Sequence, residues 1–138
     1  MNKKVFISYS REDTSEIRAL VDNLSQINLD IWSDQNISAG DNWANLIEEN
    51  LRKSEIVLLF ISPRALASEW VMMEFGAAVA LKKKIIPVVL KDTHIPSFLS
   101  EHKYIRANSI NEAAEKIKET LCKIAEQDAS ADEKKSRR

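Results

Sequence analysis

Cysteine, histidine, glycine and proline are all scarce in this chain of 138 residues. Cys122 is the single cysteine, so no intrachain disulfide can form, which fits a reducing compartment such as the cytoplasm. One cysteine and two histidines do not supply the ligands of a structural zinc site, and we expect neither a metal nor a bound cofactor. The two glycines, Gly40 and Gly76, are each expected to mark a backbone constraint.

Charge and hydropathy exclude further classes of protein. The formal net charge is -1, so there is no basic excess that favours direct binding of nucleic acid. No segment approaches the roughly 20 apolar residues of a membrane span, and the first apolar run is too short for a signal peptide. We therefore expect a cytoplasmic protein with no membrane partner.

The length predicts one domain followed by a short tail. A domain of this size buries roughly two-thirds of the surface of its unfolded chain, so it folds without disulfides or metal. From Gln127 onward apolar residues vanish apart from alanines. Residues 1–126 are therefore predicted to form the domain, and residues 127–138 a disordered polar tail or linker. Cys122 falls in an apolar helical pattern and is expected to be buried.

Short apolar runs alternate five times with helical patterns. The run from Glu55 to Ile61 is apolar after its first residue, which is typical of the centre of a parallel sheet covered by helices. The alternation predicts an α/β fold, a flavodoxin-like doubly wound five-stranded parallel sheet with helices on both faces. Strands are expected at 4–8, 29–32, 55–61, 85–90 and 103–106, and helices at 14–26, 43–51, 68–81 and 110–124, with a helical turn at 97–100.

Several polar residues are placed where helices begin. Ser62, followed by proline, and Ser109, three residues before Glu112, have the pattern of N-terminal caps. Asp13 and Asp41 are expected to cap the first and second helices in the same way.

One carboxylate interrupts the apolar run from Ser68 to Leu81. On a helix, Trp70 and Glu74 share a face, while Val71, Met72, Phe75 and Val79 are predicted to form the core-facing side. A glutamate with its head in water is the alternative. In doubly wound sheets, ligands bind at the carboxyl ends of the strands, where the loops 9–13, 33–42 and 62–68 are expected. The helix of Glu74 starts from the last of these loops.

The ordered motifs of the chain resemble those of a Toll/interleukin-1 receptor (TIR) domain. They run from about Lys3 to Ala125 and comprise Val5-Phe6-Ile7-Ser8-Tyr9-Ser10 with Asp13, Ile31-Trp32, Gly40-Asp41-x-Trp43, Ile61-Ser62 and Ser68-x-Trp70-x-x-x-Glu74. The resemblance is closer to bacterial members than to animal receptor domains, because the chain starts at Met and retains Glu74. It implies cleavage of the nicotinamide–ribose bond of NAD+, which is the substrate.

The resemblance also implies roles for individual residues. Glu74 matches the catalytic glutamate, and Trp70 is expected to pack on the sugar or the nicotinamide ring. Tyr9, Ser10, Arg11 and Ser38 are carried over as substrate-binding residues, with Arg11 facing the pyrophosphate. From its position beside Leu46 and Ile47, in contrast, Trp43 is expected to anchor the second helix.

Self-association is a further implication of the resemblance. The loop Ser33–Asn42 of one copy is expected to close over the site of the next, giving a head-to-tail homo-oligomer. Ala39 stands where family members commonly have proline, which leaves this loop less rigid. Another domain or protein with a TIR domain is an implied partner, and roles in anti-phage defence or in virulence would each suit the family.

Three functions remain open at the level of sequence. The first is an NAD+ glycohydrolase or cyclase that gives ADP-ribose or a cyclic isomer. The second is a non-catalytic TIR scaffold for signalling assemblies. The third is a nucleoside deoxyribosyltransferase-like enzyme with Glu74 as nucleophile. A phospho-receiver is disfavoured, because Ser62 stands where an aspartate is needed.

Overall fold

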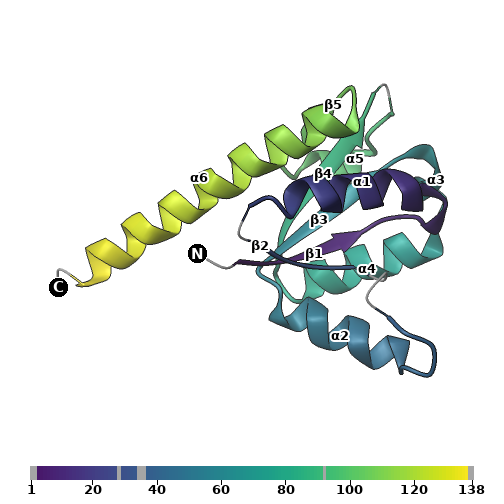
Figure 1. The fold of residues 1–138 in the computed structure, drawn as a ribbon, viewed down its shortest axis with the longest axis horizontal. Coiled ribbons are helices and arrows are strands. Elements are labelled where there is room, and N and C mark those ends of the chain that lie inside the picture. Colours follow the sequence, from purple (N-terminus) through teal and green to yellow (C-terminus); the bar gives the residue numbers. More distant parts are fainter. Residues whose placement is uncertain (1–2, 28, 34–36, 92, 137–138) are drawn as a thin grey trace.

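Five parallel strands in the order β2-β1-β3-β4-β5 form the central sheet of the computed structural model (Figure 1). The structure describes the backbone of residues 3–27, 29–33, 37–91 and 93–136. The strands are β1 (Lys3–Ser8), β2 (Leu29–Trp32), β3 (Ile56–Ile61), β4 (Lys84–Leu90) and β5 (Ile105–Ala107). The fold class predicted from the alternating pattern is thereby confirmed.

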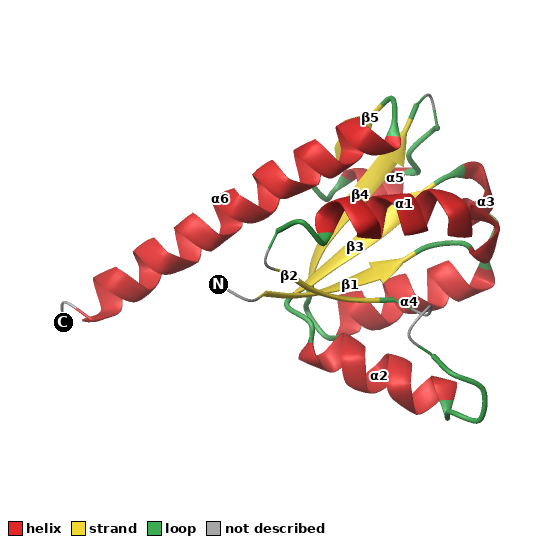
Figure 2. Ribbon diagram, in the orientation of Figure 1, coloured by secondary structure: helices red, strands yellow, loops and turns green. Residues whose placement is uncertain are grey.

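Helices connect the strands and cover both faces of the sheet (Figure 2). They are the 3-10 turn η1 (Arg11–Asp13), α1 (Thr14–Leu24), α2 (Trp43–Lys53), α3 (Pro63–Leu66), α4 (Glu69–Ala80), α5 (Ser97–Ser100) and α6 (Ile110–Ser136). The strand order reverses between β1 and β3, so the topological switch point lies at the carboxyl ends of these two strands.

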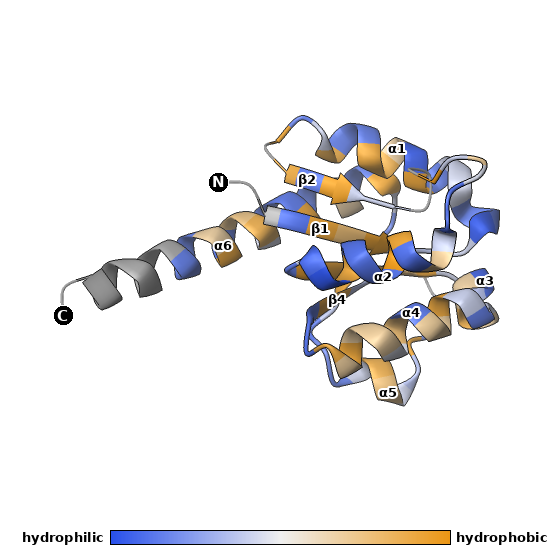
Figure 3. Ribbon diagram, turned by 90° about the horizontal axis from the view of Figure 1, so that it is seen from below, coloured by the Kyte–Doolittle hydropathy of each residue, from blue (hydrophilic) through white to orange (hydrophobic). Residues whose placement is uncertain are grey.

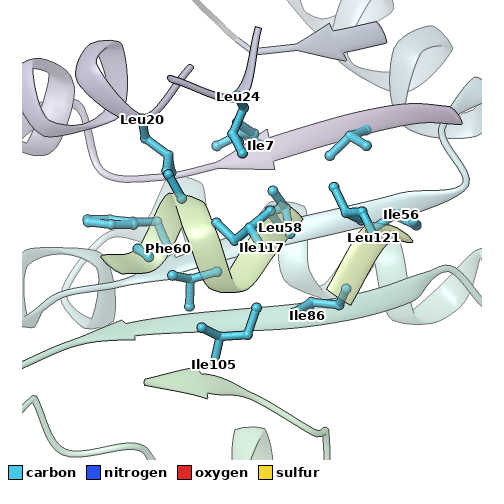
Figure 4. Packing of buried hydrophobic residues seen from close by; sticks show 14 of the residues in the cluster. Ile7, Leu20, Leu24, Ile56, Leu58, Phe60, Ile86, Ile105, Ile117 and Leu121 are labelled. Atoms are coloured by element: carbon cyan, nitrogen blue, oxygen red, sulfur yellow. The ribbon is translucent and has the colours of Figure 1, made fainter. Parts of the chain in front are cut away.

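Alternate residues of the central strand supply two separate cores. Ile56, Leu58 and Phe60 of β3 pack with α1 and α6 on one face (Figure 4). Val57, Leu59 and Ile61 pack with α2, α4 and α5 on the other face. All six residues of β3 are buried, which explains why the strand is apolar without a break.

The helices α2 and α4 differ in how the sequence orients them. Ile47 and Leu51 are the buried residues of α2, so one apolar stripe fixes its inner side. The helix α4 is apolar nearly all round, and Figure 3 colours most of it on the hydrophobic side of the scale. Val79, predicted to face the core, is 49% exposed, and Gly76 has open space around it rather than a close neighbour.

The last helix extends beyond the body of the domain (Figure 1). Its inner side carries Ile117, Leu121 and Ile124, whereas Cys122 is exposed, so the prediction that this cysteine is buried was wrong. The phase of the helix places Cys122 away from the stripe that its neighbours form. The helix α6 includes residues 127–136, which contain good helix formers and neither glycine nor proline. The disordered tail or linker expected at residues 127–138 stays a prediction. The domain boundary at residue 126 stays a prediction.

Candidate active site

Glu74 is buried on the side of α4 that faces the sheet. Its exposed fraction is 3%, and it shares this side with Val71 and Ala78. The prediction that Glu74 and the core residues lie on different faces was wrong, as was the alternative of a carboxylate in water. The helix itself starts as its sequence indicates, since Ser68 accepts a hydrogen bond from the Val71 N–H at 3.3 Å.

Ser8, at the carboxyl end of β1, is a polar partner of Glu74 that the sequence analysis missed. Its hydroxyl donates to Oε1 of Glu74 at 2.7 Å, between two buried side chains. Residues in a strand alternate between faces, so Ser8 lies on the same face as Phe6, which packs in the α2/α4 core. This alternation is the signal that identifies Ser8 as a residue facing α4.

Trp70 contacts both Trp43 and Arg11, one turn of α4 before Glu74. The rings of Trp43 and Trp70 are 5.2 Å apart between centroids, and the Arg11 guanidinium lies 5.3 Å from the centroid of a Trp70 ring. Trp43 is 50% exposed, so it does not anchor α2 in the core as predicted. The guanidinium of Arg11 and the rings of Trp43 and Trp70 therefore lie side by side near the start of α4.

Tyr9 and Ser10, predicted to bind the substrate, are both buried. Tyr9 is 3% exposed and packs in the α1/α6 core, although it also reaches the wall of a cavity. Ser10 is 6% exposed and accepts from the Glu12 N–H at 3.4 Å, which caps the short η1 turn. Both residues therefore shape the β1 loop from inside.

The described part of the Ser33–Asn42 loop contains a tight turn at Ser38–Asp41; residues 34–36 lie outside the described part. Gly40 has a φ of +90°, as the third residue of a type II turn requires. The Asp41 carboxylate accepts from the Ser38 N–H at 2.8 Å, and the Asp41 N–H donates to the Ser38 carbonyl at 3.1 Å. Asp41 therefore braces this turn, and Asn42 caps α2 instead by accepting from the Asn45 N–H.

Two cavities meet at Trp43. One, of about 480 Å³, is lined by Tyr9, Arg11, Thr14, Ile37, Ser38, Gly40, Asp41 and Trp43. The other, of about 420 Å³, lies between α2 and α4 and is lined mainly by apolar residues together with Trp43 and Glu74. The structure thus brings Tyr9, Arg11 and Ser38 to one cavity and Glu74 to the other, with Trp43 in the wall of both.

A polar cluster joins the loops that follow β1 and β3. The buried carboxylate of Asp13 accepts from the Ser62 hydroxyl at 2.5 Å and from Nη1 of Arg64 at 2.9 Å. The hydrogen bond and the charge of Asp13 raise the pKa of the Arg64 guanidinium, so Arg64 stays protonated. Asp13 makes no side-chain cap to α1, contrary to prediction, because its carboxylate is used by these two partners.

A larger cavity, of about 710 Å³, opens at the carboxyl ends of β3 and β4 on the α1/α6 face, and Asp13, Ser62 and Arg64 line part of it. None of the six predicted site residues lines this cavity. Among the residues that the structure describes, no three His, Cys, Asp or Glu side chains gather into a group that could hold a metal ion. Nor does any described helix combine the length and the apolar character needed to cross a bilayer.

Residues 5–122 match the family model described as TIR domain. This chain belongs to the TIR domain family. The resemblance stated from the motifs is confirmed by this match, which covers the β1 loop, the two cavities and the whole of α4.

Two relatives of this TIR domain carry the name of an activity. The chain is 36% identical over 90 residues, 61% of its own length, to the NAD(+) hydrolase TcpA of a Theionarchaea archaeon, and covers 27% of that protein. It is 32% identical over 76 residues, 54% of its length, to the NAD(+) hydrolase TcpC of Escherichia coli, and covers 25% of it. The chain therefore spans about a quarter of the length of these relatives.

Solved structures with lower identity share the fold. The TIR domain of the Toll-related receptor TRR-2 from Hydra magnipapillata superposes with a TM-score of 0.65 at 22% identity, covering 74% of this chain and 82% of that one. The CMP N-glycosidase BcmB of Clostridium botulinum superposes with a TM-score of 0.63 at 21% identity, covering 84% and 98%.

Proposed function

We propose that this TIR domain is an NAD+ glycohydrolase that breaks the nicotinamide–ribose bond, with Glu74 as the essential carboxylate. The observation that carries the proposal is the burial of Glu74 at the wall of the apolar α2/α4 cavity, beside the switch point of the sheet. A buried carboxylate at a cavity is costly unless it has a task or a firm set of partners. The similarity to two NAD(+) hydrolases supports the choice of substrate.

The chemistry needs one well-placed negative charge. The nicotinamide ring nitrogen is cationic in NAD+, so it takes both electrons of the breaking bond and leaves as a neutral molecule without a general acid. Positive charge develops at the anomeric carbon and the ring oxygen of the ribose, as in glycosidase transition states. A carboxylate in a water-poor cavity stabilises that charge and holds the ribose hydroxyls. Water then adds to the anomeric carbon, releasing ADP-ribose and a proton.

The residues around Trp43 suit the rest of the substrate. Trp70 offers aromatic surface for the sugar or the nicotinamide ring, and Arg11 offers a guanidinium for the pyrophosphate. Ser38, with the turn that it begins, lines the same cavity as Arg11. Tyr9 and Ser10 act from within, by setting the shape of the β1 loop. No cofactor is involved, since NAD+ is the substrate.

Self-association is proposed as the activating step. Glu74 and Arg11 line different cavities in the single chain, so a molecule of NAD+ that contacts both needs the wall at Trp43 to move. Trp43 is the first residue of α2 and follows the Ser33–Asn42 loop directly. A neighbouring copy that contacts this loop in a head-to-tail assembly, or another protein with a TIR domain, would shift Trp43 with it. We propose the cytoplasm as the compartment of the reaction.

The test compares NAD+ loss and nicotinamide release by wild type, Glu74→Gln and Glu69→Gln at high protein concentration. Glu69 is an exposed glutamate in the first turn of α4 and serves as the matched control. We expect turnover by wild type and Glu69→Gln and a loss of at least about a hundredfold in Glu74→Gln, because one electrostatic contact to a transition state is worth that much. Equal turnover by wild type and Glu74→Gln would overturn the assignment.

Product analysis separates the remaining functions. ADP-ribose that has gained a water identifies a hydrolase, whereas a product lacking that water identifies a cyclase, in which a second nucleophile of the same bound molecule attacks the ribose. An assembled protein that leaves NAD+ intact identifies the scaffold function. Turnover of deoxynucleosides without turnover of NAD+ identifies a deoxyribosyltransferase.

A further inference from the structure

Ser8 is an unusual residue for its place in the sheet. It is 1% exposed at the end of β1, a strand that pairs with β2 on one side and with β3 on the other. Its register partner Leu59 and its neighbour Phe6 on the same face are fully buried apolar residues. A buried hydroxyl in such surroundings needs a hydrogen-bond acceptor. The Ser8 hydroxyl donates its hydrogen bond to Oε1 of Glu74 at 2.7 Å.

The hydrogen bond from Ser8 holds the carboxylate end of the Glu74 side chain, which the helix backbone alone does not hold. The backbone of α4 sets the direction of the bond from Cα to Cβ, but the three remaining torsions of a glutamate are free unless contacts hold them. Ser8 comes from an inner strand of the sheet, 66 residues earlier in the chain. A hydrogen bond from this rigid strand therefore sets where the carboxylate lies. A hydrogen bond donated to a carboxylate also favours its ionised form.

Charged side chains also lie around the cavity of Glu74. Glu48 and Arg52 of α2 line the cavity of Glu74 and form an ion pair with each other at 3.0 Å, with both side chains 61% exposed. Arg11 lies over Trp70, on the side of the second cavity. Ser8 adds to these charges a hydrogen bond that reaches Oε1 of Glu74 directly.

We propose that Ser8 is a positioning residue, which orients the Glu74 carboxylate and keeps it ionised for charge stabilisation at the ribose. This inference rests on the proposed glycohydrolase function. Ser8 itself touches neither substrate nor reacting atoms, and its effect passes through Oε1 of Glu74.

The test measures kcat and KM for NAD+ across a pH series in wild type, Ser8→Ala and Ser54→Ala. Ser54 is the matched control: it is also 1% exposed, and its hydroxyl donates to the Asn50 carbonyl at 2.6 Å at the end of α2. We expect kcat of Ser8→Ala to fall about ten- to a hundredfold, the value of a hydrogen bond to a charged group, with KM changed much less. The acidic limb of its pH profile is expected to move to higher pH.

Ser54→Ala is expected to lose stability as Ser8→Ala does, and to keep the wild-type kcat and pH profile. A Ser8→Ala variant with the wild-type kcat and an unmoved acidic limb would overturn the proposal. So would an equal loss of kcat in both variants, because that result assigns the loss to general destabilisation.

A second measurement keeps the inference separate from the proposed function. The carboxyl carbon of Glu74 is followed by NMR during a pH titration of labelled wild type and Ser8→Ala, with Glu74→Gln identifying its signal. The midpoint is expected at higher pH in Ser8→Ala. If wild type does not cleave NAD+ but the midpoint moves, the proposed function fails while the role of Ser8 in holding Glu74 stands. If wild type cleaves NAD+ but neither kcat nor the midpoint changes in Ser8→Ala, the proposed function stands and the role of Ser8 fails.

Discussion

Replacing Asp13 by alanine should separate the two loops that frame the switch point. The Asp13 carboxylate is buried and joins the β1 loop to Ser62 and Arg64, which follow β3 by one and three residues. The same β1 loop carries Arg11 and Tyr9. We expect Asp13→Ala to lower both the stability of the fold and the rate of NAD+ cleavage.

The magnitude follows from the two partners. A hydrogen bond to a charged acceptor contributes about 1.5–3 kcal/mol, and the alanine leaves the buried Ser62 hydroxyl without its acceptor. Arg64 adds less, because its side chain is 53% exposed and solvent screens the pair. A loss of about 2–3 kcal/mol lowers the Tm of a domain of this length by roughly 6–15 °C.

Glu12 supplies the matched control. Its carboxylate lies 3.7 Å from Nε of the same Arg64, but its side chain is 73% exposed. Glu12→Ala should therefore shift Tm by less than about 2 °C. Both variants are melted at neutral pH and followed by circular dichroism and calorimetry, which also test two-state unfolding. Equal shifts for the two variants, or a shift below about 2 °C for Asp13→Ala, would refute the reasoning.

Two further predictions concern the cavity wall and the last helix. Trp43→Ala should increase NAD+ turnover at low protein concentration about two- to tenfold relative to wild type, because one aromatic contact holds the wall between the cavities closed. Trp43→Phe should stay near wild type. An unchanged dependence of turnover on protein concentration in Trp43→Ala would contradict this role. The Glu112 pKa lies below its ordinary value of 4.5, chiefly because the Asn108 N–H donates to its carboxylate. Its contribution is thus present above that value and lost as pH falls through the lower folded-state pKa, so Glu112→Gln should show a smaller fall of Tm under acid than wild type. Identical acid curves would exclude the contribution.

The sheet could be predicted because the hydrophobic pattern of each strand indicates whether its faces are buried. Burial on both faces leaves an unbroken apolar run such as Ile56–Ile61, and a polar residue followed by proline marks a helix start, as at Ser62. Both signals are local in sequence. The parallel sheet and the family followed from the same local pieces taken in sequence order.

The orientation of α4 could not be predicted in this way. When nearly every residue of a helix is apolar, periodicity defines no stripe, so nothing local chooses between Glu74 and Val79 as the side that faces the sheet. Long-range partners decided the matter, because Ser8 accommodates the carboxylate inside. The same holds for Asp13, which has the spacing of a helix cap but is used by Ser62 and Arg64.

The exposed Cys122 offers a labelling site for measuring distances between copies of the chain in an assembly. It is the single cysteine, so a spin label attaches at one position per copy without any substitution. It sits on α6, across the sheet from Glu74, so the label leaves the cavities clear. In a closed ring, the distances between labels form a short, finite set, whereas in an open filament they recur at multiples of one translation. Pulsed spin-label measurements on the active protein can therefore distinguish these two geometries.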